Sequence, residues 1–421
     1  MSLISEQQKM YDILEDTNDN IFVTGKAGSG KSFLLHHFVK NTKKRVIILA
    51  TTGTAALQLD IKAQTIHSFF KIRPKATEHN LPQAVRNTLK NVDTIIIDEV
   101  SMLRADLIEM IDIVIRKAKI NKGNSDAPFG GIQMVFFGDL YQLPPVVLNE
   151  ERKMLMDKYG GEYFFNAPSI KNANIKIYEL QHGHRQVDET FLSMLNQIRE
   201  AKTTRGTARK INERTCSAMP KDVLTIATTN KKAKDINMRN YDNLKIEEYL
   251  YNAKIQGEVS PMDYPVEKEL WLKVGTKIQM MRNHPTLLWS NGSLGEITKL
   301  EHNKIEVCID GHIHEVNREI WEIIEQVYNQ QTKQIEQKTI GTFEQFPMRM
   351  AWAITIHKSQ GQTYDNVAID WGSGCFSAGQ AYTALSRCKT LENMYMSSEI
   401  KPNFIWVEES VRKYMSKAVA L

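Results

Sequence analysis

The stretch Gly25-Lys-Ala-Gly-Ser-Gly-Lys-Ser32 fits the pattern G-x-x-x-x-G-K-[ST] in full. A short apolar run at residues 20–24 precedes it, and residues 32–40 after it carry an apolar helical face. A glycine-rich turn between a strand and a helix lets backbone N–H groups surround a phosphate, where the helix N-terminus adds a positive dipole. We therefore expect a nucleoside triphosphate to bind here, rather than a tight turn before an ordinary helix. Lys31 would reach the β- and γ-phosphates, and the Ser32 hydroxyl would ligate Mg²⁺.

Short apolar runs alternate with helical patterns from residue 21 to residue 180. The runs at 45–50, 94–98 and 132–137 are almost continuously apolar, which is typical of strands buried on both faces of a parallel sheet. The helical pattern at 105–119 lies between two of them and has one apolar face. This order predicts a doubly wound α/β domain whose phosphate loop follows the first strand.

A second α/β pattern begins near Tyr178, with expected strands at 222–228 and 366–370. Short alternating runs and turn residues separate these two strands, and residues 305–316 indicate a hairpin around an Asp-Gly pair. We therefore expect a small β-rich module at about residues 284–346, inserted into the second α/β domain.

Composition narrows the class of protein. The chain has 421 residues, 42% of them hydrophobic and 24% charged, which suits about two to four globular domains. Its formal net charge of +5 does not by itself require a nucleic-acid partner, so any basic groove must be local. The four cysteines are far apart, which argues against structural zinc, an iron–sulfur cluster or disulfides. The polar N-terminus does not resemble a secretory signal, and no apolar run approaches the ~18 residues of a membrane span.

Two acidic residues, Asp98-Glu99, end the apolar run at 94–98. A carboxylate at the end of a strand in this sheet can hold Mg²⁺, and its neighbour can orient and deprotonate the attacking water. Alone, such a pair could equally cap a helix that begins near Ser101. Beside a complete phosphate loop, the catalytic interpretation is favoured.

Three further residues could act on the γ-phosphate. Gln142, in Gly138-Asp-Leu-Tyr-Gln-Leu-Pro-Pro145, follows the next apolar strand and could contact both the γ-phosphate and a bound polymer. The alternative is a solvated glutamine in a loop that ends in proline. Arg185 and Arg387 could offset the charge that develops on the transferred phosphoryl group. The alternative for each arginine is a surface ion pair, which is what most arginines form.

In order and spacing, these motifs resemble those of superfamily 1B DNA helicases, and specifically the Pif-type family. The run Ala127-Pro-Phe-Gly-Gly-Ile-Gln looks like the Pif-type signature between motifs II and III and narrows the superfamily to the family. Arg185 and Arg387 stand at the arginine-finger positions of motifs IV and VI. The other motifs are Leu3-Ile-Ser-Glu-Gln7 (Q motif), Thr51-Thr-Gly-Thr-Ala-Ala56 (Ia), Thr65-Ile-His-Ser-Phe69 (Ib), Asp98-Glu-Val-Ser-Met102 (II), Gly138 to Pro145 (III) and Ile354-Thr-Ile-His-Lys-Ser-Gln-Gly-Gln-Thr363 (V).

The resemblance implies an α/β fold with two RecA-like P-loop domains. Domain 1A would cover residues 1–177, with a short wedge insertion, 1B, at about 71–87, where two prolines and several basic residues break the pattern. Domain 2A would cover residues 178–421 and contain an SH3-like β-rich insertion, 2B, at about 284–346. The sequence is little more than a helicase core, so functions housed in the long terminal extensions of many eukaryotic members are not carried over.

The resemblance also assigns roles to residues. ATP and Mg²⁺ would bind between the domains, with Gln7 reading the adenine. The residues implied in ATP binding are Gln7, Gly25, Ala27, Gly28, Ser29, Gly30, Lys31, Ser32 and Gly361, and those implied in Mg²⁺ binding are Ser32 and Asp98. Catalysis would rest on Lys31, Glu99, Gln142, Arg185 and Arg387. Single-stranded DNA would contact Thr52, Gly53, Thr65, His67, Phe69, Thr355, His357 and Lys358.

These DNA candidates include the residue types of a single-strand channel, which combines basic groups with aromatic side chains. Phe69 and Phe70 could instead be core residues, as a Phe-Phe pair usually is, so His67 and Lys358 are the better candidates. The histidine pairs elsewhere lack cysteine or carboxylate companions at ligand spacing, and we expect no metal there.

The sequence thus predicts an ATP-dependent DNA helicase that moves on single-stranded DNA as its cleft opens and closes. The 5′-to-3′ direction comes from the resemblance alone. We expect single-stranded DNA and single-strand/duplex junctions as partners, no membrane, a monomer in solution, and a cytoplasmic, nucleoid-associated location if the source is bacterial. DNA repair, telomere maintenance and G-quadruplex DNA are settings of the family; the sequence does not choose among fork, R-loop and G-quadruplex.

Two other classes stay open. A DNA-stimulated ATPase could clamp DNA or strip protein from it without unwinding, and a forked-duplex assay would separate it from a helicase. A P-loop kinase is more distant, because the paired distal arginine motifs and the inserted β-rich module speak against it.

Overall fold

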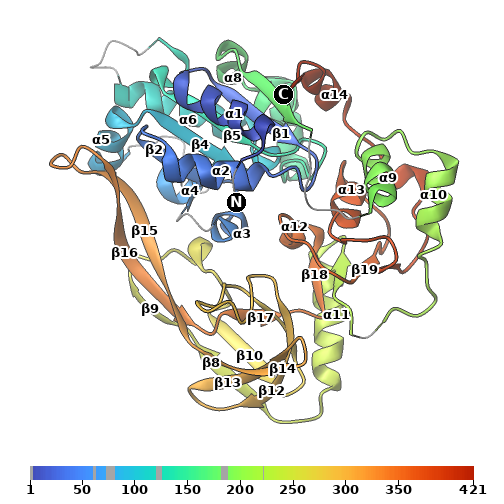
Figure 1. The fold of residues 1–421 in the computed structure, drawn as a ribbon. Coiled ribbons are helices and arrows are strands. Elements are labelled where there is room, and N and C mark those ends of the chain that lie inside the picture. Colours follow the sequence, from blue (N-terminus) through green and yellow to red (C-terminus); the bar gives the residue numbers. More distant parts are fainter. Residues whose placement is uncertain (1–2, 60–62, 73–80, 120–125, 182–187, 221) are drawn as a thin grey trace.

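The first α/β domain is built on a seven-stranded parallel sheet, and the phosphate loop leaves from β1 (Ile21–Gly25) in its interior (Figure 1). The computed structural model describes residues 3–59, 63–72, 81–119, 126–181, 188–220 and 222–421. The other strands are β2 (Val46–Ala50), β3 (Gln64–Thr65), β4 (Thr94–Asp98), β5 (Gln133–Phe137), β6 (Lys176–Leu180) and β21 (Val419–Ala420), in the order β21-β6-β1-β5-β4-β2-β3. All neighbouring pairs are parallel, which confirms the expected doubly wound sheet.

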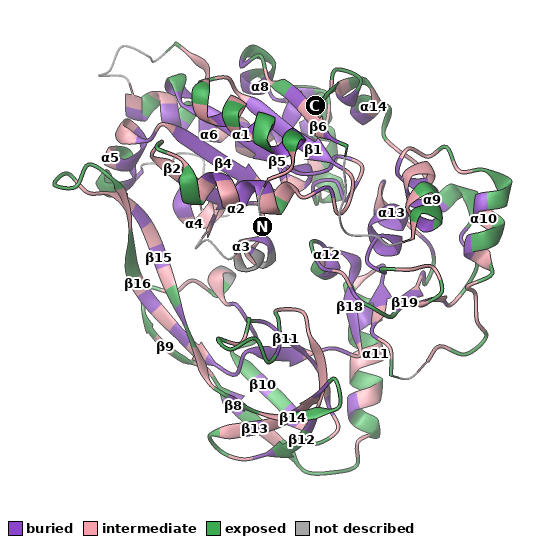
Figure 2. Cartoon of the chain, viewed as in Figure 1, coloured by how far each residue is buried: buried purple, intermediate pink, exposed green. Residues whose placement is uncertain are grey.

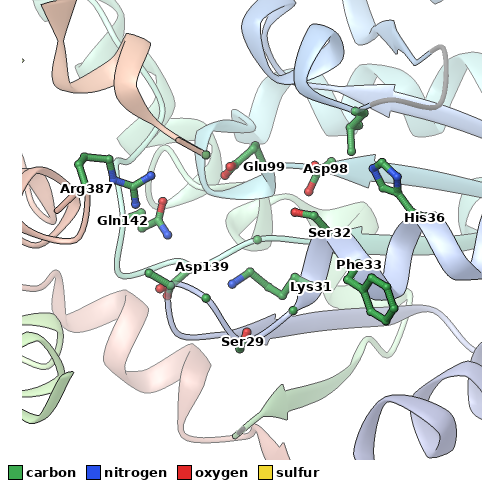
Figure 3. A pocket seen from close by; sticks show the side chains of 16 residues that line it. Ser29, Lys31, Ser32, Phe33, His36, Asp98, Glu99, Asp139, Gln142 and Arg387 are labelled. Atoms are coloured by element: carbon green, nitrogen blue, oxygen red, sulfur yellow. The ribbon is translucent and has the colours of Figure 1, made fainter. Parts of the chain in front are cut away.

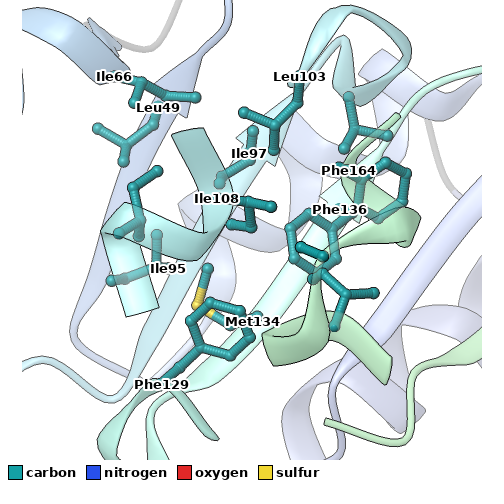
Figure 4. Packing of buried hydrophobic residues seen from close by; sticks show 14 of the residues in the cluster. Leu49, Ile66, Ile95, Ile97, Leu103, Ile108, Phe129, Met134, Phe136 and Phe164 are labelled. Carbon is teal, nitrogen blue, oxygen red and sulfur yellow. The ribbon is translucent and has the colours of Figure 1, made fainter. Parts of the chain in front are cut away.

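Helices cover both faces of this sheet because side chains of its strands alternate between two apolar cores. On β1, Phe22 points into one core with Phe136 and Ile108, while Ile21 and Val23 belong to the other. Figure 4 shows the first of these cores, and Figure 2 shows the buried strands between more exposed helices. The helices are α1 (Ser5–Asp16), α2 (Lys31–Asn41), α3 (Gly53–Gln58), α4 (Ile66–Phe69), α5 (Gln83–Asn91), α6 (Ala105–Lys119), α7 (Asn149–Tyr159), α8 (Pro168–Asn172) and α14 (Glu409–Met415).

The second α/β domain has a smaller parallel sheet, in the order β18-β7-β19-β20. Its strands are β7 (Thr225–Ala227), β18 (Ala353–Thr355), β19 (Val367–Asp370) and β20 (Met394–Met396), and its helices are α9 (Glu189–Arg199), α10 (Arg205–Asn212), α11 (Asn230–Asn243), α12 (Ile356–Ser359) and α13 (Gln380–Leu385). Trp371 is fully buried in its core. None of the helices in the described ranges is long and apolar enough to cross a membrane.

The β-rich module is larger than the sequence predicts, since antiparallel strands run from residue 248 to residue 350 instead of 284–346. The predicted hairpin is confirmed as β13–β14, which turns at Asp310 and Gly311. The SH3-like character of the module stays a prediction. The strands are β8 (Glu248–Asn252), β9 (Lys254–Gly257), β10 (Glu269–Lys273), β11 (Lys277–Met280), β12 (Leu294–Leu300), β13 (Lys304–Ile309), β14 (His312–Asn317), β15 (Glu319–Tyr328), β16 (Ile335–Gln345) and β17 (Met348–Met350).

A long hairpin, β15–β16, leaves the module and reaches the first domain beside α5 (Figure 1). Gln326 of this hairpin bonds both backbone groups of Ile48, accepting from its N–H at 3.3 Å and donating to its carbonyl at 3.1 Å. Gln64 reciprocates: its amide donates to Ile324 O at 2.6 Å, and its carbonyl oxygen accepts from the Gln326 N–H at 3.0 Å. The two α/β domains are therefore joined by the module as well as by the chain between them.

Three predicted boundaries need correction. The division at residues 177 and 178 cuts through β6, which pairs with β1 along its whole length and so belongs to the first sheet. The C-terminal strand β21 pairs with β6, so the end of the chain returns to the first domain. Of the predicted 71–87 insertion, residues 83–87 lie in α5, whose Val85 is buried in the first core, while residues 73–80 lie outside the described ranges.

Candidate nucleotide site and nucleic-acid cleft

A cleft of about 530 Å³ lies at the carboxyl ends of β1, β4 and β5 and is closed on one side by the second domain. We call it the first cleft. Figure 3 shows Arg387 and Gln142 together at one side of it, with Ser32 and Asp98 at the other. The sequence-predicted residues that line it are Ala27, Gly28, Ser29, Gly30, Lys31, Ser32, Asp98, Glu99, Gln142, Gly361 and Arg387.

The phosphate loop has the shape of an anion cradle. Gly28 and Gly30 both have φ of +82°, a left-handed conformation that turns their N–H groups and that other residues rarely adopt. The Lys31 ammonium donates to two carbonyls of its own loop, Gly25 O at 2.7 Å and Lys26 O at 3.0 Å. The Ser29 hydroxyl is buried and has no hydrogen-bond partner among the described residues. These groups suit a polyphosphate, which would take up the loop's donors.

Burial lowers the pKa of Lys31, and the charges of Asp139 and Glu99 oppose that effect. An ammonium held in a low-dielectric site interacts strongly with an anion placed beside it. Lys31 therefore has the position and the environment that contact with phosphate requires.

Gln7, the predicted adenine reader, lies beneath the loop rather than in the lining of the first cleft. A Cβ added at Gly30 would stand 2.3 Å from the Gln7 Nε2, so the Gln7 side chain lies directly against the loop. The Gln7 Oε1 accepts from the Ile4 N–H at 3.4 Å, while its Nε2 is buried and without a partner within the described ranges. Such an orphaned donor fits an adenine nitrogen, although Gln7 must shift to reach one.

Asp98 and Glu99 are both buried at the end of β4. Burial, followed by the charge of Glu99, raises the pKa of Asp98 to about 7. Burial also raises the pKa of Glu99, against the opposing charges of Lys31 and Arg387. Glu99 has a φ of +52°, a strained conformation for a residue with a side chain. A cation placed beside these two buried carboxyl groups would favour their charged forms and so lower both pKa values.

The donor set of this site fits Mg²⁺. The Ser32 hydroxyl and the Asp98 carboxylate both line the first cleft. No group of three His, Cys, Asp or Glu side chains gathers to hold a metal anywhere in the ranges described. Mg²⁺ typically takes one or two protein oxygens and completes its shell with phosphate oxygens and water. Ser32 and Asp98 would therefore hold the ion together with bound nucleotide.

One residue beside the candidate base was not predicted from the sequence. Gln360, which follows α12 of the second domain, donates through its Nε2 to Glu99 Oε2 at 2.9 Å. Gln360 lies inside the predicted motif V, but no local pattern shows that its side chain crosses to the other domain.

The candidates for the γ-phosphate differ in how they are held. Gln142 is buried, and its Oε1 has no partner in the described part of the chain, so it could accept a hydrogen bond from an attacking water. The Arg387 guanidinium donates to three second-domain carbonyls, those of Thr383, Ser359 and Gln362. These bonds fix Arg387 at the wall of the first cleft. Arg185 lies outside the described residues.

A second cleft, of about 770 Å³, lies between the first domain and the β-rich module. Gly53 and Thr65 are the predicted DNA contacts that line it. Leu59 lines both clefts, so the two clefts adjoin at this residue. On the module side, Tyr264, Arg282 and Trp321 supply aromatic and basic surface, with the Arg282 guanidinium 5.8 Å from the Trp321 ring centre. These three residues were not predicted from the sequence, because they stand outside every predicted motif.

The other predicted DNA contacts do not line the second cleft. Thr52 and Thr355 cap helices α3 and α12, each accepting from a backbone N–H. His67 and His357 are half-buried, and burial lowers the pKa of both. Lys358 is exposed.

The structure contradicts the prediction that Phe69 contacts single-stranded DNA. It is fully buried in the first core, with its ring 4.9 Å from that of Phe70 in an edge-to-face arrangement. It has no surface to offer a nucleotide base, so the core interpretation of this Phe-Phe pair is right.

Known proteins resemble this chain over most of its length. Residues 2–209 match the family model described as PIF1-like helicase, and residues 350–394 match a UvrD-like helicase C-terminal domain. The ATP-dependent DNA helicase Pif1 of Bdellovibrio bacteriovorus is 29% identical over 411 residues, which cover 94% of this chain and 88% of that protein.

Two solved structures of Bacteroides Pif1 are similar over almost the whole chain. The complex with ADP-AlF4 has a TM-score of 0.88 and 34% identity, covering 99% of this chain and 98% of that one. The structure bound to single-stranded DNA has a TM-score of 0.73 and 34% identity, covering 99% and 97%. The phosphate loop, the carboxylate pair and the motif order are thus found in a chain that belongs to the PIF1-like helicase family, the ATP-dependent DNA helicases of Pif1 type.

Proposed function

We propose that this helicase moves 5′ to 3′ on single-stranded DNA and unwinds duplex DNA by closing and opening the first cleft. The observation that carries this proposal is that one cleft joins the phosphate loop of the first domain to Arg387 of the second. A nucleotide that binds both walls favours the closed form, and its hydrolysis removes that preference. The direction of movement rests on the family signature at residues 127–133.

Hydrolysis can be assigned to this chain's own residues. Glu99 is placed to accept a proton from the attacking water, and Gln142 to hold that water by its orphaned Oε1. Lys31 and Arg387 would offset charge on the phosphoryl oxygens from opposite walls. Mg²⁺, held by Ser32 and Asp98, would supply further charge neutralisation when bound.

DNA would occupy the second cleft. Its lining comes from both the first domain and the module, so a change in their spacing would change the grip on a strand. Bacteroides Pif1, which is similar over the whole chain, has been solved bound to single-stranded DNA. Because each cleft is lined by residues of a single chain, we propose a monomer as the working unit.

Two partial duplexes that differ only in which strand end carries the single-stranded tail test the proposal. The chain should unwind the 5′-tailed substrate with ATP and Mg²⁺, and fail with the 3′-tailed one. Lys31→Ala, which removes the phosphate-binding ammonium, is the control that should lose both hydrolysis and unwinding. Unwinding of the 3′-tailed substrate alone would reverse the direction. DNA-stimulated hydrolysis without unwinding of either substrate would favour the alternative, an ATPase that holds DNA or strips protein from it without unwinding.

A further inference from the structure

The motif III loop, residues 138–145, belongs to the first domain by sequence but is packed inside the second. Leu143 is fully buried in the second-domain core with Phe191 and Leu195. Gly379, at the start of α13, lies so close that an added Cβ would stand 2.3 Å from Gln142 O. No other residue fits at Gly379, so α13 and the loop meet backbone to backbone.

A buried ion pair lies beside this contact. Arg199, the last residue of α9, is 2% exposed and donates to both oxygens of Asp139, with Nη2 3.0 Å from Oδ1 and Nε 3.2 Å from Oδ2. Its other Nη group lies 3.1 Å from Glu179 of β6, and its guanidinium stacks 4.3 Å from the Tyr141 ring centre. Removing two charges from water is costly, and only such close geometry offsets the cost. Neither Asp139 nor Arg199 has a part in the proposed chemistry.

The Tyr382 hydroxyl joins this ion pair to the phosphate loop. It accepts from the Ala27 N–H at 3.0 Å and donates to Asp139 Oδ2 at 3.3 Å. Tyr382 is buried on α13, and Arg387 follows two residues after that helix ends. One hydroxyl thus connects the loop that surrounds the phosphates, the motif III loop and the element that carries the candidate arginine finger.

We propose that Tyr382 and Arg199 are positioning residues that hold the phosphate loop and Arg387 at the spacing needed for hydrolysis. Asp139 is their shared partner, and the three side chains form what we call the interdomain clamp. The proposal rests on the proposed function, and its residues couple the two walls of the first cleft. Of the three clamp residues, Asp139 lines the first cleft and Tyr382 and Arg199 do not contribute to its lining. Loss of Tyr382 or Arg199 should therefore slow the chemical step and leave nucleotide binding to the phosphate loop.

Tyr382→Phe is the sharpest test, because it removes one oxygen and leaves the ring in place. We expect kcat for DNA-stimulated hydrolysis to fall about tenfold, with KM for ATP and affinity for a fluorescent ADP analogue within about threefold of wild type. Tyr414→Phe is the matched control. Tyr414 is half-buried, and its buried hydroxyl has no partner among the residues described, so its removal should leave kcat unchanged.

Two further variants separate positioning from a general loss of structure. Arg199→Lys keeps the charge but loses the forked contact with Asp139, so kcat should lie between wild type and Arg199→Met. Tyr382→Phe in an Asp139→Asn background should cost less than the product of the two single effects, because both act through one hydrogen bond. Additive effects would show that Tyr382 and Asp139 act independently.

Wild-type activity distinguishes failure of the clamp from failure of the proposed function. A wild-type chain without DNA-stimulated hydrolysis would overturn the function itself. A wild-type chain that hydrolyses ATP normally, with Tyr382→Phe equal to Tyr414→Phe, would overturn the clamp alone. Parallel losses of melting temperature, ADP affinity and kcat in Tyr382→Phe would also overturn it, because they mark a purely structural residue.

Discussion

Gln360 of the second domain donates a hydrogen bond to Glu99 of the first, with 2.9 Å between its Nε2 and the Glu99 Oε2. The contact joins the candidate general base to motif V, which contains α12 and, on that helix, Lys358. Opening the cleft must break this bond, so the orientation of the base depends on how the two domains sit. Hydrolysis and domain position are therefore linked at a single side chain.

Glu99→Gln should keep ATP and DNA binding while lowering turnover roughly 10²–10⁴-fold, because an amide cannot accept the proton from water. Steady-state hydrolysis and DNA affinity are measured side by side. Glu213→Gln, at an exposed position after α10, is the control and should behave as wild type. Turnover near normal in Glu99→Gln would rule Glu99 out as the base.

Arg387→Ala should lower kcat by roughly 10³-fold or more while changing nucleotide affinity by less than about tenfold, as expected of an arginine finger. Removing the guanidinium also takes its hydrogen bond from the Gln362 carbonyl of the second domain, so a fall in melting temperature should accompany it. Arg387→Lys keeps the charge and separates the two effects. An increase in KM alone would make Arg387 a binding residue.

The phosphate loop and the carboxylate pair could be predicted because their residues stand at characteristic spacings next to apolar runs in the sequence. Lys31 and Ser32 begin the helix that follows β1, Asp98 ends β4 and Glu99 follows it. Parallel strands of one sheet end at the same edge, so these four residues all line the cleft there. The strands and helices of the first domain follow from the same apolar periodicity.

The interdomain contacts could not be predicted in this way. Arg199 and Tyr382 meet Asp139 from segments far away in sequence, and neither has a neighbour pattern that indicates its partner. Phe69 fell in a motif that suggested DNA, yet its neighbour Phe70 shows the stronger tendency of paired aromatics to be buried. The predicted domain boundary at residues 177 and 178 was wrong because the apolar pattern of β6 does not show which of the two sheets this strand joins.

DNA binding should be mostly electrostatic. The logarithm of the affinity for oligo-dT should fall linearly with log salt, with a slope near −0.7 for each phosphate neutralised. Arg282→Ala, inside the second cleft, should flatten the slope by less than about one unit. Lys358→Ala should do the same if this exposed lysine also contacts the strand. An affinity that does not change with salt concentration would contradict a mainly electrostatic contact with DNA.

The half-buried His357 should make stability depend on pH. Burial lowers its folded-state pKa below the ordinary value near 6.5, so the folded form favours the neutral ring. The unfolded chain then binds more protons, and stability is lost as pH falls from about 6.5 through the folded pKa. His357→Gln should lose less free energy of unfolding between pH 7 and pH 5 than wild type. Urea titrations at both values measure the difference, and identical losses would show that the ring does not titrate differently on folding.

The two hydrogen bonds between Gln326 and the Ile48 backbone should contribute to both the stability of the fold and its affinity for DNA. Gln326→Ala would leave the Ile48 N–H and carbonyl buried without partners, at about 1–3 kcal/mol for each unsatisfied group, unless the hairpin detaches. Detachment of the hairpin would widen the second cleft, because residues 320–324 of the same strand line it. We therefore expect a lower melting temperature and weaker binding of oligo-dT, with hydrolysis at saturating DNA little changed, since the first cleft has no wall from the hairpin. Gln334→Ala, exposed near the hairpin tip, is the matched control. If both variants bind DNA equally well, the hairpin's contact with the first domain does not shape the second cleft.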